Sequence, residues 1–196
     1  MTRGKLIVIS APSGSGKTTI AKAVMRQYPS MLFSVSATTR KMRGGEVNGK
    51  DYFFLTKNEF QDKLKNDALV EWEEIYGDYY GTLRSEVDRA LEHGTVMLFD
   101  VDVKGGLSIK ERYPTDAVLI FIKPPDLESL KQRLVNRKTE DEATIKRRLD
   151  RAAMELEMGK KFDYQVTNDD LAKAIGEVDG IVRHHTEGLL VHQSSS

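Results

Sequence analysis

The sequence predicts an α/β fold with a doubly wound parallel sheet. Short apolar runs alternate along the chain with segments of helical periodicity, and the first run leads through a glycine-rich loop into a helix. Strands separated by helices pair in parallel, because each crossover helix returns the chain to the same end of the sheet. The expected strands are 6–9, 31–36, 51–55, 68–76, 95–102, 117–122 and 164–167.

The first strand and the helix after it define the start of this fold. Residues 6–9 are apolar without alternation, which suits a strand buried on both faces. A helix is expected from about Gly16 because Ile20, Ala23 and Val24 share one face, and Pro29 ends it. Further helices are expected at 57–66, 83–93, 105–113, 126–138, 142–159 and 171–181, with a turn at 77–82.

The loop between the first strand and the first helix has the composition of a phosphate-binding loop. Its glycines let successive N–H groups point inward, and the helix presents the positive end of its dipole. Lys17 stands where its charge reaches the β- and γ-phosphates, and Thr18 offers a hydroxyl ligand to Mg²⁺. The sequence therefore predicts a nucleoside triphosphate site made by Ala11, Pro12, Ser13, Gly14, Ser15, Gly16, Lys17, Thr18 and Thr19.

One residue of this loop departs from the Walker A pattern. Ala11 stands where that pattern has its first glycine, so the backbone there must have a negative φ. The alternative is a serine- and glycine-rich turn that binds nothing. The position of Gly16, Lys17 and Thr18 disfavours that alternative.

Composition limits the classes of protein to which the chain can belong. The 196 residues suffice for one α/β domain, and no 18-residue apolar run or secretory segment is present, so we expect a cytoplasmic protein. Lys plus Arg and Asp plus Glu are equal at 30 each, which argues against a dedicated nucleic-acid surface. The absence of cysteine excludes disulfides, thiolate metal sites and cysteine nucleophiles.

Charged residues in three further segments are candidates for function. Arg40 and Arg43 lie in a hydroxyl- and glycine-rich loop and could clamp a phosphate, although a solvated charged loop is the ordinary alternative. In strand 68–76, Glu71 and Glu73 point to the same face; either could be functional, or both could form a charged edge. Strand 95–102 ends in Asp100 and Asp102, as a Walker B strand does near Mg²⁺; the alternative is an aspartate that only ends a strand.

The last candidate segment is a helical hairpin rich in basic residues. Hairpins of this kind above a phosphate loop often act as lids, although such a charge run is more often a solvated helix face. The residues concerned are Arg133, Arg137, Lys146, Arg147, Arg148 and Arg151.

Together these segments resemble one enzyme family. The motifs at 11–18, 34–40, 43–46, 49–52, 71–72, 79–81 and 168–170 occur in the order found in guanylate kinases. Over residues 4–184 the chain resembles that family of nucleoside monophosphate kinases, which move the γ-phosphoryl group of ATP to GMP. The resemblance implies ATP and Mg²⁺ as cofactors and GMP or dGMP as acceptor. It implies no nucleic-acid, membrane or protein partner.

The resemblance also implies roles for individual residues. Glu71 matches the glutamate that reads guanine, whose N1–H and N2 amino donors one carboxylate can accept together; adenine would leave that carboxylate unpaired. Ser36 and Thr82 match hydroxyls near the base, and Arg40, Arg43, Tyr52 and Tyr80 match residues that hold the GMP phosphate. Lys17, Arg137 and Arg148 match catalytic residues, with Arg133 a weaker candidate; Asn168 matches a position near adenine. Thr18 and Asp100 are expected at the metal and Asp102 at the acceptor.

The same resemblance divides the chain into parts. The expected core comprises 4–34, 95–125 and 160–184, the GMP-binding segment 35–94 and the lid 126–159, with a tail at 185–196. Two rival functions stay open at this point. One is a guanylate-kinase-like module that binds proteins and has lost catalysis, and the other is a P-loop kinase for a different small acceptor.

Overall fold

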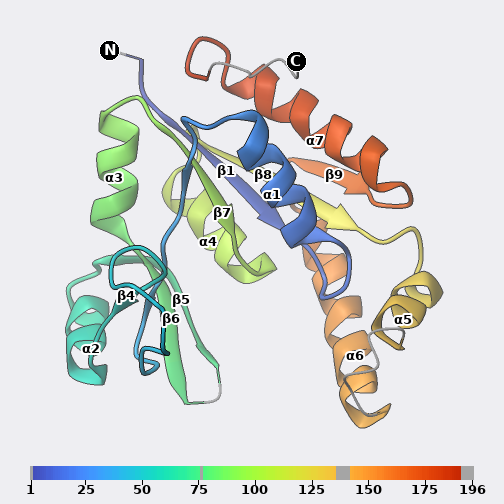
Figure 1. Cartoon of the computed structure of the whole chain (residues 1–196), viewed down its shortest axis with the longest axis horizontal. Helices are drawn as coiled ribbons and strands as arrows, with labels where there is room; N and C mark the ends of the chain where they lie inside the picture. The colour runs from blue at the N-terminus through green and yellow to red at the C-terminus, as the bar shows by residue number, and fades with distance from the viewer. Residues whose placement is uncertain (1, 76, 136–141, 191–196) are drawn as a thin grey trace.

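The structure, a computed structural model, describes residues 2–75, 77–135 and 142–190. Within them, five parallel strands form a central sheet of order β2-β7-β1-β8-β9. These strands are β1 (Lys5–Ser10), β2 (Leu32–Phe33), β7 (Val96–Asp100), β8 (Ala117–Lys123) and β9 (Tyr164–Thr167). The predicted parallel, doubly wound α/β fold is confirmed (Figure 1).

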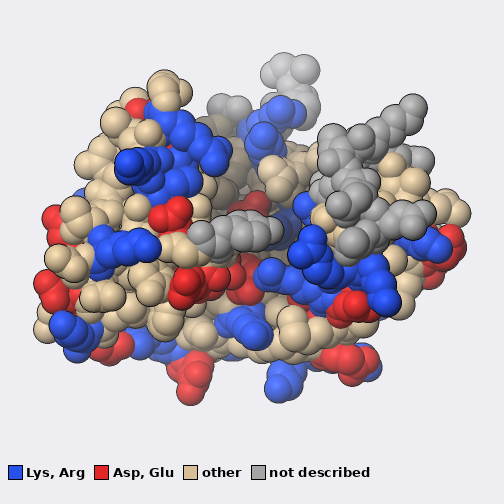
Figure 2. All heavy atoms as spheres, turned by 90° about the horizontal axis from the view of Figure 1, so that it is seen from below, with Lys and Arg blue, Asp and Glu red and all other residues tan. Residues whose placement is uncertain are grey.

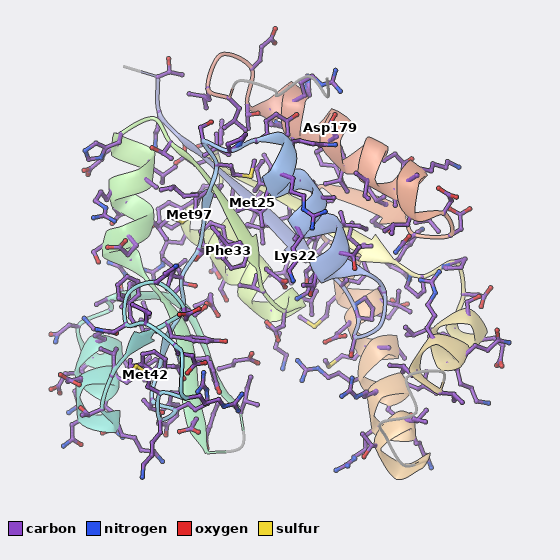
Figure 3. The ribbon with its side chains drawn as sticks, in the orientation of Figure 1. Lys22, Met25, Phe33, Met42, Met97 and Asp179 are labelled. Atoms are coloured by element: carbon purple, nitrogen blue, oxygen red, sulfur yellow. The ribbon has the colours of Figure 1, made fainter. Side chains whose placement is uncertain are left out.

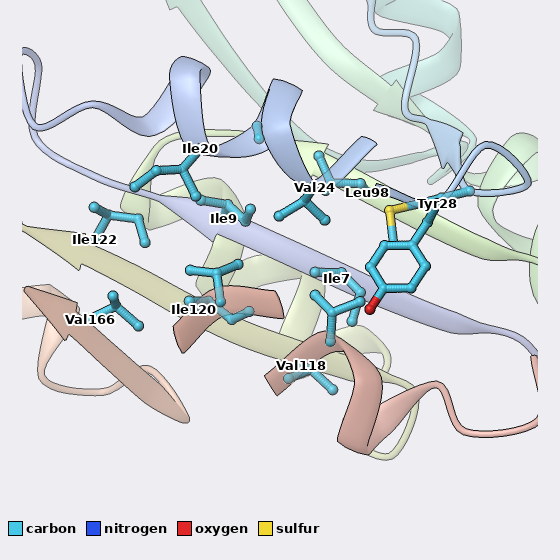
Figure 4. Close-up of a cluster of buried hydrophobic side chains, with 14 of the residues drawn as sticks. Ile7, Ile9, Ile20, Val24, Tyr28, Leu98, Val118, Ile120, Ile122 and Val166 are labelled. Carbon is cyan, nitrogen blue, oxygen red and sulfur yellow. The ribbon is translucent and has the colours of Figure 1, made fainter. Parts of the chain in front are cut away.

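Helices cover both faces of the central sheet. Alternate residues of β1 point to opposite faces, so Ile7 and Ile9 join the core under α1 (Lys17–Gln27) and α7 (Leu171–His185). Leu6 and Val8 join the other core, under α3 (Arg84–Glu92) and α4 (Val103–Arg112). Figure 4 shows the first core, in which Ile20 and Val24 of α1 lie over the β-branched side chains of β1 and β8.

A buried hydrogen bond joins the two helices of the first face. The hydroxyl of Tyr28 donates to Asp179 Oδ1 of α7 at 2.7 Å, and Figure 3 labels Asp179 on that helix. Arg183 donates to the other carboxylate oxygen at 2.6 Å. The buried aspartate therefore has a partner on each oxygen, which is what a buried charge requires.

A second sheet stands beside the central one. It has the order β4-β3-β6-β5 in the described residues and is packed against α2 (Lys57–Lys65). Its strands are β3 (Ala37–Thr38), β4 (Phe53–Phe54), β5 (Leu69–Ile75) and β6 (Asp78–Leu83). The predicted strand 31–36 was therefore too long: β2 covers Leu32–Phe33 in the central sheet, and the chain then crosses to begin β3 in the second sheet.

The predicted turn at 77–82 was also wrong, because that segment is the strand β6, which pairs antiparallel with β5. A Cβ on Gly81 would lie 2.7 Å from the carbonyl oxygen of Glu71 on the neighbouring strand. The glycine therefore permits close approach of two strands rather than a reversal of the chain.

Two helices lie near the end of β1 that leads into the phosphate loop, on the side opposite the second sheet (Figure 1). They are α5 (Leu127–Val135) and α6 (Glu142–Gly159), joined by a small cluster of Leu130, Leu134 and Ala152. Figure 1 shows this helix pair and the second sheet on opposite sides of the carboxyl end of β1. Among the described residues, no helix combines the length and apolar character that crossing a membrane would need.

Candidate functional site

The loop between β1 and α1 has a backbone geometry that suits anion binding. Gly14 and Gly16 have φ of 93° and 91°, values that side chains other than glycine rarely adopt. No described side chain caps α1, and no acidic residue lies in its first turn. The first N–H groups of the helix and its dipole are thus available to an anion.

Lys17, Thr18 and Asp100 meet at the end of this loop. Ile9 of β1 pairs with Asp100 of β7, so the parallel register brings the end of the acidic strand beside the loop. The Lys17 ammonium forms an ion pair with Asp100 and donates to the carbonyl oxygen of Val101 at 3.1 Å. Thr18 Oγ1 lies 3.5 Å from Asp100 Oδ2.

These oxygens fit a magnesium ion that also binds phosphates. Mg²⁺ takes one or two protein oxygens and completes its shell with water and phosphate oxygens. The Thr18 hydroxyl and the Asp100 carboxylate are donors of that kind. No group of three or more His, Asp or Glu side chains in the described part of the chain could hold a metal ion.

Two residues of the loop differ in what their backbone needs. Ala11 is buried, and Asp67 is the only described residue other than glycine with a positive φ, so Ala11 has a conformation that alanine adopts freely. At Gly16, by contrast, a Cβ would lie 2.3 Å from Asn168 Nδ2. Glycine is thus needed at Gly16, the second glycine of the Walker A pattern, and not at Ala11, where the pattern has its first.

Asn168 lies under the phosphate loop, where it is 5% exposed. Its side-chain Nδ2 donates to the backbone carbonyl oxygen of Ser15 at 2.8 Å, and the backbone carbonyl oxygen of Asn168 accepts from Arg133 Nη2 at 2.9 Å. Asn168 thus supports the loop, and Arg133 ties α5 to the same segment.

The β5–β6 hairpin presents several predicted residues on one face. Glu73 pairs with Tyr80 across the hairpin, so the alternation of side chains puts Glu71, Glu73, Tyr80 and Thr82 on the same side. Thr82 is 2% exposed, and its hydroxyl donates to Glu71 Oε1 at 2.6 Å. In this structure Thr82 therefore orients the Glu71 carboxylate.

The surroundings of Glu71 favour its neutral form. Burial raises the pKa of Glu71 to about 7, and the negative charges of Asp102 and Glu73 act in the same direction, against the hydrogen bond from Thr82. Burial also raises the pKa of Glu73. Glu71 is therefore a carboxyl group whose charge changes near neutral pH.

Gly105, in the first turn of α4, allows Glu71 to approach Asp102. A Cβ on Gly105 would lie 3.1 Å from Glu71 Oε2 and 3.2 Å from Asp102 Oδ1. The same Asp102 oxygen accepts from the Gly105 N–H at 2.8 Å and so caps α4. Both carboxylates thus approach the same side of Gly105, where a side chain would contact them.

We expect Gly105→Ala to raise the KM for the acceptor about tenfold, because the added methyl group pushes the Glu71 carboxylate from its place. Steady-state kinetics measure this. Gly180→Ala in α7 is the matched control, since a Cβ there meets nothing within 4 Å. Equal kinetics in the two variants would show that Gly105 does not position Glu71.

The predicted phosphate-binding residues form one cluster on the second sheet. Arg40 donates to both carboxylate oxygens of Glu46, at 2.7 and 3.1 Å, and its guanidinium carbon lies 5.1 Å from the centre of the Tyr52 ring. The Tyr52 and Tyr80 ring centroids are 6.2 Å apart. Glu46 also accepts from the Arg43 N–H at 2.7 Å, so one carboxylate fixes the loop that carries both arginines.

Helix α6, in the predicted lid, turns one stripe of side chains toward the phosphate loop. A cavity of about 600 Å³ lies between them, bounded by the loop, Asp102 and residues Thr144, Arg147, Arg148, Arg151 and Glu155. Arg148 Nη1 donates to Ser13 Oγ at 2.7 Å. Figure 2 shows basic side chains gathered on both sides of a hollow, with acidic ones between them.

Some predicted residues are not joined to these clusters, and others were missed. Arg137 lies outside the described residues. Ser36 is partly exposed beside β3, where its carbonyl oxygen accepts from the Phe53 N–H at 2.9 Å. Glu46, which holds Arg40, was missed, although its place in the Arg-Gly-Gly-Glu segment was a usable signal. Gly105 was also missed, because no sequence pattern reports a close approach between α4 and β5.

Comparisons with known proteins agree with this geometry. A family model described as guanylate kinase matches residues 3–185. A protein of Chlorobium luteolum named guanylate kinase is 47% identical over 175 residues, 89% of each chain. One of Myxococcus xanthus with that name is 44% identical over 180 residues, 91% of this chain and 86% of its own. The crystal structure of guanylate kinase from Anaplasma phagocytophilum, 30% identical, superposes with a TM-score of 0.72, covering 95% of this chain and 88% of that one. The chain belongs to the guanylate kinase family of nucleoside monophosphate kinases.

Proposed function

We propose that this protein transfers the γ-phosphoryl group of ATP to GMP or dGMP, giving ADP and GDP or dGDP, with Mg²⁺ bound to the nucleotide. One observation carries the proposal. Asp102 borders the cavity over the phosphate loop, and both Asp102 and Glu71, the carboxylate suited to guanine, lie beside Gly105. A donor site and an acceptor site of the right chemistry are therefore neighbours.

The acceptor would bind along the second sheet. Ionised Glu71 accepts from guanine N1–H and N2–H, with Ser36 close to the base and Thr82 holding the carboxylate. Arg40, Arg43, Tyr52 and Tyr80 hold the GMP phosphate. In that state Arg40 exchanges part of its pairing with Glu46 for phosphate oxygens, which bind a guanidinium fork equally well.

The donor would bind in the phosphate loop. Lys17 leaves its ion pair with Asp100 to meet the β- and γ-phosphates, and Asn168 keeps the loop in shape from below. Thr18 and Asp100 would hold the Mg²⁺, which neutralises phosphate charge when bound.

Transfer would proceed in line, without a covalent intermediate. A phosphate monoester is already largely ionised near neutral pH, so no strong general base is required. Catalysis then comes from positioning and from neutralisation of charge by Lys17, Arg148 and, by sequence resemblance, Arg137. We assign 35–94 to GMP binding and 126–159 to a lid whose closure excludes water from the transfer.

A coupled assay of ADP release with GMP, dGMP, AMP and UMP tests the proposal. We expect turnover with the two guanine nucleotides and little with the others, because adenine and uracil do not present the paired donors that Glu71 accepts. Preferred turnover of AMP or UMP would indicate a kinase for another acceptor. No turnover with any of the four would indicate a module that has lost catalysis.

The raised pKa of Glu71 predicts a pH dependence of GMP use. A protonated Glu71 cannot accept from both guanine donors, so kcat/KM for GMP should fall as the pH falls through about 7, approaching about tenfold per pH unit. The second ionisation of the GMP phosphate, at about pH 6, causes a separate fall in kcat/KM at lower pH. Measurement of kcat/KM from acid to neutral pH checks this.

Glu71→Gln is the control for that measurement, because it removes the carboxyl group and leaves the ionisation of GMP. The fall in kcat/KM near pH 7 should disappear in this variant, and only the fall that comes from the GMP phosphate, at lower pH, should persist. An identical acid limb in the two proteins would show that Glu71 does not titrate in the free enzyme.

A further inference from the structure

Arg151 joins the lid helix to the acceptor side of the site. Its Nη2 donates to Asp102 Oδ2 at 3.4 Å, while its Nε donates to Glu155 Oε1, one turn further along α6, at 2.9 Å. The Asp102 carboxylate is thus contacted on both oxygens, by the Gly105 N–H on Oδ1 and by Arg151 on Oδ2. The guanidinium fork can make both contacts at once because its donors diverge in a fixed plane.

The carboxylates around Arg151 need a cation. The Glu155 side chain is 8% exposed, and burial raises the pKa of Glu155 while Arg151 lowers it. The charge of Arg151 also lowers the pKa of Glu73, which burial and Asp102 raise. Lys17 is paired with Asp100, and Arg151 forms ion pairs with both Asp102 and Glu155.

Arg151 is separate in position from the arginine that contacts the phosphate loop. Arg148 lies one turn earlier on α6 and donates to Ser13 of the loop. The rise of three residues in a helix is about 4.5 Å, so α6 directs Arg148 at the phosphate loop and Arg151 at Asp102, on the wall of the same cavity. The spacing suits a lid that meets both substrates.

We propose that Arg151 is a positioning residue for the acceptor: it fixes the Asp102 carboxylate and links the closing lid helix to the GMP side of the site. The proposal rests on the proposed function. It assigns Arg151 an effect on the use of GMP and not on the binding of ATP, which separates it from Arg148 and Lys17.

Arg151→Ala tests this through the separation of KM and kcat. We expect the KM for GMP to rise about tenfold, because a hydrogen bond to a charged partner is lost, and the KM for ATP to change less than about twofold. Lys173→Ala is the control, since Lys173 is an exposed cation on α7, outside the helical hairpin. A rise in the KM for ATP alone, or kinetics equal to the control, would overturn the proposal.

A double-mutant cycle with Asp102→Asn tests whether Arg151 acts through Asp102. The rise in the KM for GMP caused by Arg151→Ala should be smaller in the Asp102→Asn background, because the partner of Arg151 is already changed there. Equal losses in both backgrounds would contradict that route. Arg151→Lys should recover only part of the activity, since one ammonium group cannot contact both carboxylates as the fork does.

Two checks keep the outcome decisive. If a thermal unfolding curve shows that Arg151→Ala does not fold, the same cycle is run with Arg151→Lys, which retains the charge. Wild-type protein without GMP-dependent ADP formation would defeat the proposed function. An active wild type with an unaffected Arg151→Ala variant would defeat only the role of Arg151.

Discussion

Lys17→Met should lose nearly all turnover while the protein stays folded. The Lys17 ammonium faces Asp100 and the carbonyl oxygen of Val101 at the mouth of the phosphate loop, where it can transfer to the β- and γ-phosphates. Methionine keeps the length and helix propensity but removes the charge that offsets negative charge in the transition state. We expect kcat to fall at least about 100-fold.

Lys22→Met is the matched control, because it makes the same change at an exposed position of α1, where Figure 3 labels Lys22. It should retain wild-type kinetics. Steady-state kinetics and a melting curve of each variant decide the outcome. Normal turnover and an unchanged melting curve in Lys17→Met would show that Lys17 does not belong to the site.

Glu71→Gln should have the second-largest effect, and one that depends on the base. The substitution replaces a carboxylate oxygen with an NH₂ donor, which would face a guanine donor or turn away, so at least one base hydrogen bond is lost. A hydrogen bond of this charged kind contributes about 1.5 to 3 kcal/mol, or about ten- to more than a hundredfold in kcat/KM for GMP. AMP should suffer less, because its N1 acceptor can meet the new amide donor.

The measurement is kcat/KM for GMP and AMP in the wild type, Glu71→Gln and Glu73→Gln. Glu73 is a suitable comparison because it lies on the same face of β5 and its pKa is also raised by burial. The GMP to AMP preference should shrink in Glu71→Gln only. A preference lost in Glu73→Gln and kept in Glu71→Gln would identify the other carboxylate as the guanine reader.

The central fold was predictable because its signals are local. Apolar runs without alternation marked β1 and β8, and helical spacing with Pro29 marked α1. The second sheet was harder to predict, since β3 and β4 are two residues long and exist through pairing with distant segments. Gly81 in β6 likewise has a tertiary reason, the approach of β5, that periodicity does not report.

Some parts of the candidate site were likewise predictable from local sequence, and others were not. The phosphate loop is one contiguous segment, so the positions of Lys17 and Thr18 could be predicted from spacing alone. The link between Glu71 and Asp102 joins β5 to α4 through Gly105, and the contact of Arg151 with Asp102 crosses 49 positions of sequence. Contacts of that range depend on the packed fold, so the sequence indicated Glu71, Asp102 and Arg151 but neither the contacts between them nor the role of Gly105.

The claim that this chain moves a phosphoryl group from ATP directly to GMP is tested most directly by identifying the products. Phosphorus NMR of a reaction containing the wild-type protein, ATP, Mg²⁺ and GMP reports every phosphate species at once. We expect ADP and GDP to appear in equal amounts, with little inorganic phosphate, because the closed site excludes water. ADP accompanied by inorganic phosphate and no GDP would contradict the account.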